Sequence, residues 1–346
     1  MVLVAIAGGT SATLGRSLVT AILATGKHEV VIVSRQPSGL NEPPGGSTYG
    51  AVIKYVDYSS QSSITSALNG VHTLISVLKI LDPGHMTDTH VTLLRAAIKA
   101  EVKRFAASDW SLGPKSHDDV LASKKQLYEA CKDVAVETGS DIEVCQFQNG
   151  AFLEYFAQGL PHPSEERKRD LLGGLEDDMM QEYINIVKGK LVIPLRRDGK
   201  PAEVGMASIR DIGRLVAAAL DLPTGAKGWY GMVQMCGWRG TFEDVRELLK
   251  ETNAPEIEKE TVSMQQCDQK AEDFEKILTN SFDIGALMGK MEAQMMRSVC
   301  LEDEGAMVRG DLNEILHEAG IGIETRDLSQ YLKEVWGIKQ QVPRAC

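Results

Sequence analysis

Apolar residues in the first 150 positions gather in short runs, and segments with helical periodicity separate these runs. The runs lack the apolar–polar alternation of a strand with one wet face, which is typical of parallel strands covered on both sides. They lie at residues 2–7, 30–34, 52–57, 73–78, 104–107 and 142–146. Helical patterns lie between them, such as residues 14–24, 87–100 and 122–137. This order predicts an α/β fold with a doubly wound parallel sheet.

Beyond residue 150 the alternation stops. A turn-rich segment at 159–166 and a densely charged one at 166–178 precede an expected strand at 191–194 and a helix at 208–220. Most of the remainder is helical in pattern, at residues 242–251, 268–278, 283–296 and 312–319. We therefore predict a nucleotide-binding domain over 1–150 and a smaller, mainly helical substrate-binding region over 151–346. Some segments within about residues 190–222 are expected to return to the sheet. Residues 36–50, rich in Pro, Gly and Ser, should form an exposed loop.

The first expected strand continues into the glycine-rich stretch A-G-G-T-S-A-T-L-G-R at residues 7–16. A dinucleotide pyrophosphate requires a tight turn, close backbone approach and the free N–H groups of a helix N-terminus. Gly8 and Gly9 supply the turn, Gly15 lies where the helix passes the sheet, and Ser11-Ala12 replaces the usual middle glycine. A tight β–α connection without a ligand is the alternative. The position after the first strand favours a Rossmann-type site. Its predicted cofactor contacts are Gly8, Gly9, Thr10, Ser11, Thr13, Leu14 and Gly15.

Two further positions bear on the cofactor. Ser34-Arg35 ends the second strand, where NAD-binding proteins usually place an acid for the ribose hydroxyls. An acid would repel a 2′-phosphate, whereas the planar guanidinium of Arg35 grips one, so we predict NADP(H). The alternative for Arg35 is a solvated loop cation. Asp57, at the end of the third strand, either accepts a hydrogen bond from the adenine amino group or caps the helix that follows Ser60.

Catalytic candidates follow the strand at 104–107. Ser108 should emerge at the carboxyl edge of the sheet, where open α/β folds bind ligands. Twelve residues later begins V-L-A-S-K, residues 120–124. Short-chain dehydrogenases carry a strand-end serine and, about a dozen residues on, Y-x-x-S-K at the start of a long helix. In this register Val120 stands at the tyrosine position and Lys124 keeps the lysine.

A second tyrosine–lysine pair, Tyr128 and Lys132, has the spacing Y-x-x-x-K but begins eight residues too late. Eight residues displace a helical side chain by about 12 Å along the axis. We expect Tyr128 to be structural or at the pocket edge. Lys125 and Lys132 should point elsewhere around the helix and be solvated.

These motifs resemble those of the atypical short-chain dehydrogenases of the NmrA-like, isoflavone reductase-like family, in its fungal form. The resemblance covers nearly the whole chain and rests also on N-G-A-F-L-E-Y-F at 149–156, D-I-G-R-L-V-A-A-A-L at 211–220 and the closing L-N-E-I-L…Y-L-K-E-V-W-G within 312–337. In the reductase branch of this family, a lysine at the position of Lys124 is the catalytic acid/base and contacts the cofactor ribose. Partial desolvation would lower the pKa of such a lysine toward the working pH.

Pocket residues are expected after the strand at 142–146. Asn149, Phe152 and Tyr155 should line the substrate pocket, as the resemblance also implies, although core packing is an alternative for Phe152. Trp110 either stacks on a planar substrate or packs an interface. The methionines at 288, 291, 295 and 296 have helical spacing, which favours core packing over an adaptable pocket roof.

Composition narrows the class of protein. The 346-residue chain has a net charge of -11, which disfavours nucleic acid as a partner. Its six cysteines are scattered, so neither a disulfide framework nor a metal site is expected. No signal peptide or apolar stretch of about 20 residues is evident, so we predict a cytoplasmic protein that does not enter membranes. The oligomeric state stays open.

The sequence thus predicts an NADPH-dependent reductase of a small apolar or aromatic compound, phenolic or like a secondary metabolite. Lys124 would handle the proton, and Ser108 and Asp109 would orient the substrate or the lysine. Hydride would go to a carbonyl, an activated double bond or a benzylic carbon. Two alternatives remain: a non-catalytic NADP(H) redox sensor of the NmrA type, and an isomerase or cyclase without net redox chemistry.

Overall fold

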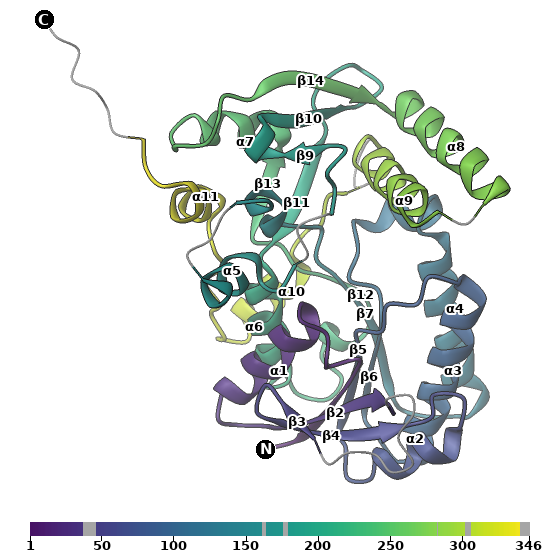
Figure 1. The fold of residues 1–346 in the computed structure, drawn as a ribbon. Coiled ribbons are helices and arrows are strands. Elements are labelled where there is room, and N and C mark those ends of the chain that lie inside the picture. Colours follow the sequence, from purple (N-terminus) through teal and green to yellow (C-terminus); the bar gives the residue numbers. More distant parts are fainter. Residues whose placement is uncertain (37–45, 161–163, 176–178, 282, 302–305, 340–346) are drawn as a thin grey trace, which may run out of the picture.

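The structure is a computed structural model that describes residues 1–36, 46–160, 164–175, 179–281, 283–301 and 306–339. An eight-stranded sheet forms the centre of the lower body in Figure 1. From edge to edge its strands are β12 (Gly231–Gln234), β7 (Glu143–Gln148), β6 (Arg104–Ala107), β5 (Thr73–Ser76), β1 (Leu3–Ala7), β2 (Glu29–Arg35), β4 (Ala51–Val56) and β3 (Ser47–Thr48). All neighbours pair in parallel except the short β3, which is antiparallel to β4. The predicted Rossmann-type doubly wound sheet is confirmed.

The chain order reverses between β1 and β5. From β1 the chain proceeds outward to β2 and β4, and it then crosses back to β5 on the other side of β1. Open α/β sheets bind ligands outside the carboxyl ends of the strands at such a switch point. The fold therefore places the glycine-rich turn after β1 and the polar residues after β6 at the same edge.

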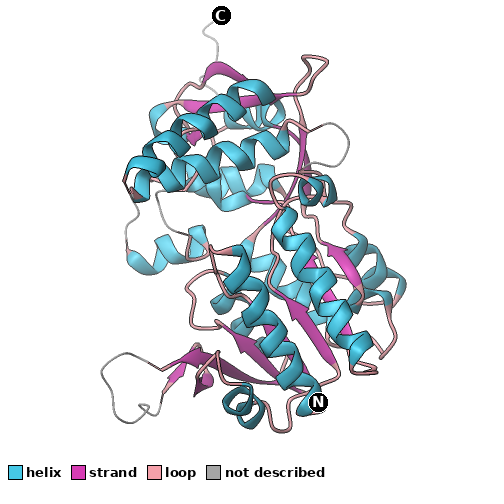
Figure 2. Cartoon of the chain, turned by 90° about the vertical axis from the view of Figure 1, so that its right-hand side faces the viewer, coloured by secondary structure: helices cyan, strands magenta, loops and turns pink. Residues whose placement is uncertain are grey.

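Helices cover both faces of this sheet, and Figure 2 shows helices in front of its strands. Buried side chains of α1, α6 and α10 pack on one face, and those of α2, α3 and α4 pack on the other. In α1 the buried residues Leu14, Leu18, Val19 and Ile22 form one apolar stripe, which explains why this segment docks as a helix. The helices are α1 (Leu14–Ala24), α6 (Ile209–Ala219), α10 (Asp311–Glu318), α2 (Gln61–Ala67), α3 (Pro83–Lys99) and α4 (Ala122–Glu137).

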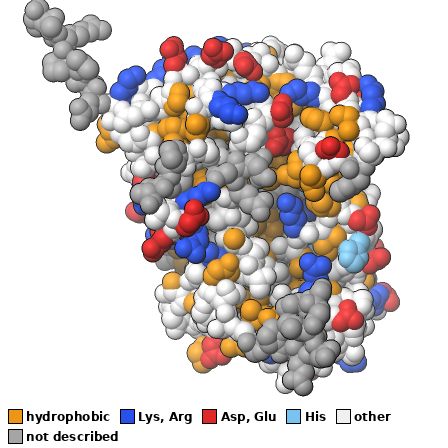
Figure 3. All heavy atoms as spheres, viewed as in Figure 1, with side chains coloured by type: hydrophobic (Ala, Val, Ile, Leu, Met, Phe, Trp, Pro, Cys, Tyr) orange, Lys and Arg blue, Asp and Glu red, His pale blue; other side chains and the backbone are white. Residues whose placement is uncertain are grey.

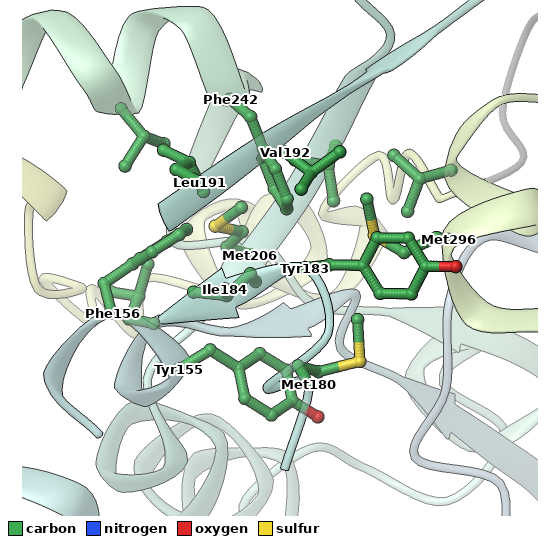
Figure 4. Packing of buried hydrophobic residues seen from close by; sticks show 14 of the residues in the cluster. Tyr155, Phe156, Met180, Tyr183, Ile184, Leu191, Val192, Met206, Phe242 and Met296 are labelled. Atoms are coloured by element: carbon green, nitrogen blue, oxygen red, sulfur yellow. The ribbon is translucent and has the colours of Figure 1, made fainter. Parts of the chain in front are cut away.

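A second region with its own core lies above this sheet in Figure 1. It contains two three-stranded sheets, ordered β14-β10-β9 and β13-β11-β8. Figure 4 shows aromatic and aliphatic side chains from its different elements converging. Its strands are β8 (Ala151–Phe152), β9 (Ile184–Asn185), β10 (Lys190–Leu195), β11 (Glu203–Ala207), β13 (Trp238–Thr241) and β14 (Glu258–Ser263). Its helices are α5 (Glu165–Leu172), α7 (Phe242–Leu249), α8 (Met264–Asn280), α9 (Ile284–Val299) and α11 (Leu328–Trp336). Short 3-10 turns are η1 (Pro114–Asp118), η2 (Leu153–Ala157), η3 (Ile186–Lys188) and η4 (Lys227–Trp229).

Of the segments within about residues 190–222 that were expected to return to the large sheet, one packs on it. β10 and β11 belong to the two small sheets, and only α6 packs on the large sheet, beside α1. The strand that rejoins the large sheet is β12, which pairs with β7 from Gly231↔Cys145 to Gln234↔Gln148. The reason is that β7 offers a free edge that β12 completes, while β11 finds partners in β8 and β13.

The loop predicted at 36–50 is described only in part. Residues 37–45 lie outside the described residues, and Ser47–Thr48 form β3. On the face seen in Figure 3, described Lys and Arg side chains form separate groups with acidic and apolar side chains between them. None of the helices within the described ranges has the length and apolar character needed to cross a bilayer.

Candidate active site

The glycine-rich turn between β1 and α1 is closely packed. Gly8 has φ +79°, in the left-handed region that favours glycine, and its N–H donates to the carbonyl oxygen of Val33 at 3.0 Å. A Cβ on Gly15 would lie 2.7 Å from the carbonyl oxygen of Gly9. The helix therefore touches the turn directly, which is the close approach that the sequence predicted for Gly15.

Polar groups of the turn define the start of α1. The Ser11 hydroxyl accepts a hydrogen bond from the Gly15 N–H at 3.0 Å, and Thr13 directly precedes the first helical residue, Leu14. Thr10 is exposed, and its carbonyl oxygen accepts from the Tyr49 hydroxyl at 3.3 Å. The first turn of α1 holds no acidic side chain, so nothing there offsets the positive end of the helix dipole.

The ends of β2 and β4 carry the other predicted cofactor residues. Ser34 is half-buried and Arg35 is exposed at the end of β2. The Asp57 carboxylate accepts from the backbone N–H of Ser59 at 2.9 Å and from the Ser59 hydroxyl at 2.7 Å, and these bonds lower the pKa of Asp57. Ser60, not Asp57, caps α2, because the Ser60 hydroxyl accepts from the Ser63 N–H.

Lys124 lies at the carboxyl edge of β6. Its amine donates to the carbonyl oxygen of Ser108 at 3.0 Å. Burial lowers the pKa of Lys124, and the negative charge of Asp109 acts in the opposite direction. The Ser108 hydroxyl donates to the carbonyl oxygen of Leu78 at 3.0 Å, so this side chain joins two loops rather than facing the lysine.

Trp110 is held in an unusual backbone conformation. Its φ of +53° lies in the left-handed region, which a residue with a bulky side chain rarely adopts. Its backbone N–H donates to Phe147 O and its indole N–H donates to Ser76 O, both at 2.8 Å. Its ring also lies 5.5 Å from that of Phe147. These contacts favour packing for Trp110, and they fix the chain immediately after Asp109.

Asp109 belongs to a buried polar cluster that sequence reasoning did not find. Its carboxylate contacts the Nε2 of His117 at 3.1 Å, the hydroxyl of Ser111 and the side-chain amide of Gln148 at 3.3 Å. His117 comes from η1 and Gln148 from the end of β7. Two features of the sequence could have indicated this cluster: the run Q-F-Q-N-G at residues 146–150, and His117 between Ser108 and Lys124.

A second buried histidine lies near Lys124. His90 on α3 donates from Nδ1 to the carbonyl oxygen of Met86 at 2.7 Å, so its Nε2 accepts from the Ser76 hydroxyl at 2.9 Å. Burial lowers the pKa of His90 to about 4, with a smaller contribution from Lys124 in the same direction. His90 is therefore neutral at physiological pH.

The other candidates on α4 lie elsewhere. The Lys125 amine pairs with Asp118 at 2.5 Å, and Lys132 pairs with Glu129 at 2.8 Å on the exposed side. The Tyr128 hydroxyl lies 3.9 Å from the position that a Cβ on Gly231 would take, at the start of β12. Tyr128 is thus displaced from the carboxyl edge along the helix.

The predicted pocket residues differ in exposure. Asn149 is fully buried, and its amide N–H donates to Gly150 O at 2.9 Å while its Oδ1 has no hydrogen-bond partner. Tyr155 is 5% exposed and belongs to the core of the second region, as Figure 4 shows. Phe152 is half-buried between two hydrophobic clusters, 5.8 Å from the Tyr155 ring. Phe152 is therefore the most accessible of the three.

The four methionines on α9 fall into two groups that differ in their packing. Met296 is fully buried in the core of the second region, and Met295 packs against it. Met288 and Met291 are half-buried and stand outside the three hydrophobic clusters of the described residues. Core packing accounts for the first pair.

A cavity of about 790 Å³ lies away from Lys124. Residues of α1, α5, α6 and the segment 321–334 line it, including Arg16, Arg167, Arg169, Arg210, Arg214 and Arg326. Across the described residues, no group of three or more His, Cys, Asp or Glu side chains is arranged to hold a metal ion.

Comparison with known proteins decides the family. The sequence matches the NmrA-like family over residues 2–312. The chain belongs to the NmrA-like family. A curated relative, Oxidoreductase BOA1 of Botryotinia fuckeliana (strain B05.10), is 30% identical over 249 residues, which cover 71% of this chain and 74% of the relative.

Solved structures share the fold of this NmrA-like protein at low sequence identity. The crystal structure of isoflavone reductase is 17% identical with a TM-score of 0.65, covering 96% of this chain and 98% of its own. The triphenylmethane reductase of Citrobacter sp., complexed with NADP(H), is 15% identical with a TM-score of 0.62, covering 96% and 99%. The family and the oxidoreductase class predicted from the sequence are thereby confirmed.

Proposed function

We propose that this NmrA-like protein is an NADPH-dependent reductase of a small apolar or aromatic compound, with Lys124 as the proton donor. The observation that supports this most is a desolvated amine, 3.0 Å from Ser108 O, at the carboxyl edge of the sheet. A lysine whose pKa is lowered gives up its proton more readily at neutral pH than an exposed lysine.

The residues of the first β–α turn fit a dinucleotide. Gly8, Gly9 and Gly15 let the backbone come close to a pyrophosphate, and the start of α1 offers the positive end of its dipole without a competing acid. Arg35, exposed at the end of β2, would pair with a 2′-phosphate. The triphenylmethane reductase of the same fold holds NADP(H). When bound, NADPH would supply the hydride.

The chain's own residues handle the proton. The Lys124 ammonium would donate to the substrate atom that gains negative charge, whether a carbonyl oxygen or the carbon next to an activated double bond. Lys124 is half-buried, so water can restore its proton. Phe152 is half-buried between two hydrophobic clusters and would offer an apolar contact to an aromatic substrate.

The test is NADPH oxidation with a panel of phenolic ketones, enones, quinones and triphenylmethane dyes. The matched pair of variants is Lys124→Ala and Lys125→Ala, since Lys125 is a neighbouring lysine that pairs with exposed Asp118. General acids contribute about 10²–10⁴-fold, so Lys124→Ala should lose at least about 100-fold in kcat while Lys125→Ala retains it. Equal activity in both variants would show that Lys124 is not the donor.

A redox sensor remains the competing function, because Val120 replaces the tyrosine of the short-chain dehydrogenase pattern. Tight NADPH binding together with no turnover of any panel member would favour it. An isomerase or cyclase would convert a substrate without consuming NADPH, which product analysis detects.

A further inference from the structure

A buried polar cluster surrounds the carboxylate of Asp109, and its other members are Ser111, His117 and Gln148. Asp109 is 5% exposed, His117 1% and Gln148 0%. An isolated carboxylate in such a place is unfavourable unless hydrogen-bond donors surround it. Ser111, His117 and Gln148 supply those donors from three different segments: the loop after β6, η1 and β7.

The hydrogen atoms of the cluster can be assigned. The Nε2 of His117 lies 3.1 and 3.3 Å from the two Asp109 oxygens, so Nε2 carries the hydrogen and donates. The Gln148 amide nitrogen lies 3.2 Å from both ring nitrogens of His117, and it donates to the Asp109 carboxylate at 3.3 Å. These donors converge on the carboxylate of Asp109, whose negative charge acts on the Lys124 amine.

Few other charges face Lys124. His90 on α3 is neutral, as argued above. Lys125 turns outward to Asp118, and Asp119 pairs with Arg297 of α9. The Lys124 amine contacts the carbonyl oxygen of Ser108, the residue before Asp109, and among the residues that the structure describes Asp109 is the negative charge that acts on this amine.

We propose that His117 and Gln148 are positioning residues that hold the Asp109 carboxylate buried beside Lys124, so that its fixed negative charge keeps the Lys124 amine protonated and ready to donate. The part of this inference that concerns catalysis rests on the proposed function. The electrostatic part does not, because it concerns the proton affinity of one amine in the resting protein.

The experiment titrates Lys124 directly. Lysines of the full chain are reductively methylated with ¹³C, and the Lys124 signal is assigned by its loss in Lys124→Arg. Asp109→Asn should raise the acid dissociation constant of this amine about tenfold or more, because it removes the buried charge of the residue that follows Ser108, whose carbonyl oxygen the amine contacts. His117→Leu should shift it in the same direction. His117→Gln, which restores an N–H donor, should shift it less.

Ser111→Ala is a milder variant for the case that Asp109→Asn does not fold. It removes one donor from the carboxylate and should give a smaller shift of the same sign. An unchanged Lys124 titration in both Asp109→Asn and Ser111→Ala, or equal shifts in His117→Leu and His117→Gln, would overturn the proposal.

Activity provides a second readout once a substrate is found. As a general acid, Lys124 is active below its pKa, so the alkaline limb of kcat/KM should move to lower pH in Asp109→Asn. If no substrate turns over, the proposed reductase fails while the titration still decides the role of the cluster. If turnover depends on Lys124 but the titration does not respond, the cluster is structural only.

Discussion

Lys124 and Tyr128 lie one turn apart on α4, yet only the lysine reaches the carboxyl edge of the sheet. The Lys124 amine is 3.0 Å from Ser108 O after β6, whereas the Tyr128 hydroxyl lies beside Gly231 at the start of β12. Four residues of a helix separate side chains by about 6 Å along its axis. The apparent Y-x-x-x-K motif therefore spans two environments, and its lysine, Lys132, is exposed.

Removal of the Tyr128 hydroxyl should leave catalysis intact. We expect Tyr128→Phe to keep kcat within about twofold of wild type, because a general acid would contribute about 10²–10⁴-fold. NADPH oxidation with any substrate found in the panel measures this. A 100-fold loss in Tyr128→Phe, with normal NADPH affinity, would transfer the proton donor from Lys124 to Tyr128.

Arg35 should determine the choice of dinucleotide. Loss of a charge-assisted contact to a phosphate costs about 1.5–3 kcal/mol, so Arg35→Ala should weaken NADPH binding by about 10- to 100-fold and leave NADH unchanged. Lys99→Ala, which removes an exposed cation from the last turn of α3, is the control and should change neither affinity. Calorimetric titration gives both constants. Parallel losses for the two dinucleotides would refute the assignment.

A methyl group at position 15 should disturb the dinucleotide turn. In Gly15→Ala the new Cβ would lie 2.7 Å from Gly9 O, closer than van der Waals contact allows. We expect a free energy of unfolding lower by about 1–3 kcal/mol and at least tenfold weaker NADPH binding. Gly322→Ala is the control, because nothing lies within 4 Å of the added group. Wild-type NADPH affinity in Gly15→Ala would argue against a phosphate site there.

Glu154 should make stability depend on pH. It is 1% exposed, its Oε1 accepts from the Ile209 N–H at 2.9 Å, and its Oε2 has no hydrogen-bond partner. Burial raises the pKa of Glu154 to about 8. Between the unfolded pKa of 4.5 and this value the folded state binds a proton that the unfolded state lacks, so stability falls as pH rises through that window.

Glu154→Gln should remove this dependence. The amide keeps the acceptor for Ile209 and carries no charge, so the variant should be more stable than wild type at pH 8 by about 2–4 kcal/mol and nearly equal at pH 5. Chemical denaturation at the two pH values measures the difference. Glu166→Gln, on the exposed surface of α5, should behave as wild type at both. A Glu154→Gln protein that is destabilised at pH 8 would contradict the prediction.

Local sequence patterns were sufficient to predict many of the strands and helices. The strands β1, β2, β4, β5, β6 and β7 and the helices α1, α3 and α4 follow from continuous apolar runs, helical periodicity and the glycine turn, all of which are read within one segment. The family resemblance added the proposed role of Lys124, because motif spacing along the chain fixes its register relative to Ser108.

The partners of these residues were decided by tertiary structure. Asp109, His117 and Gln148 come from segments up to 39 residues apart, and no periodicity relates them. The same holds for β12. Its sequence does not differ from that of other short apolar runs, and its place in the large sheet depends on pairing with the edge of β7. Sequence by itself therefore determined the sheet, the cofactor turn and the catalytic candidate. Folding alone decided which charges surround that candidate, since burial and proximity arise only when distant segments pack together.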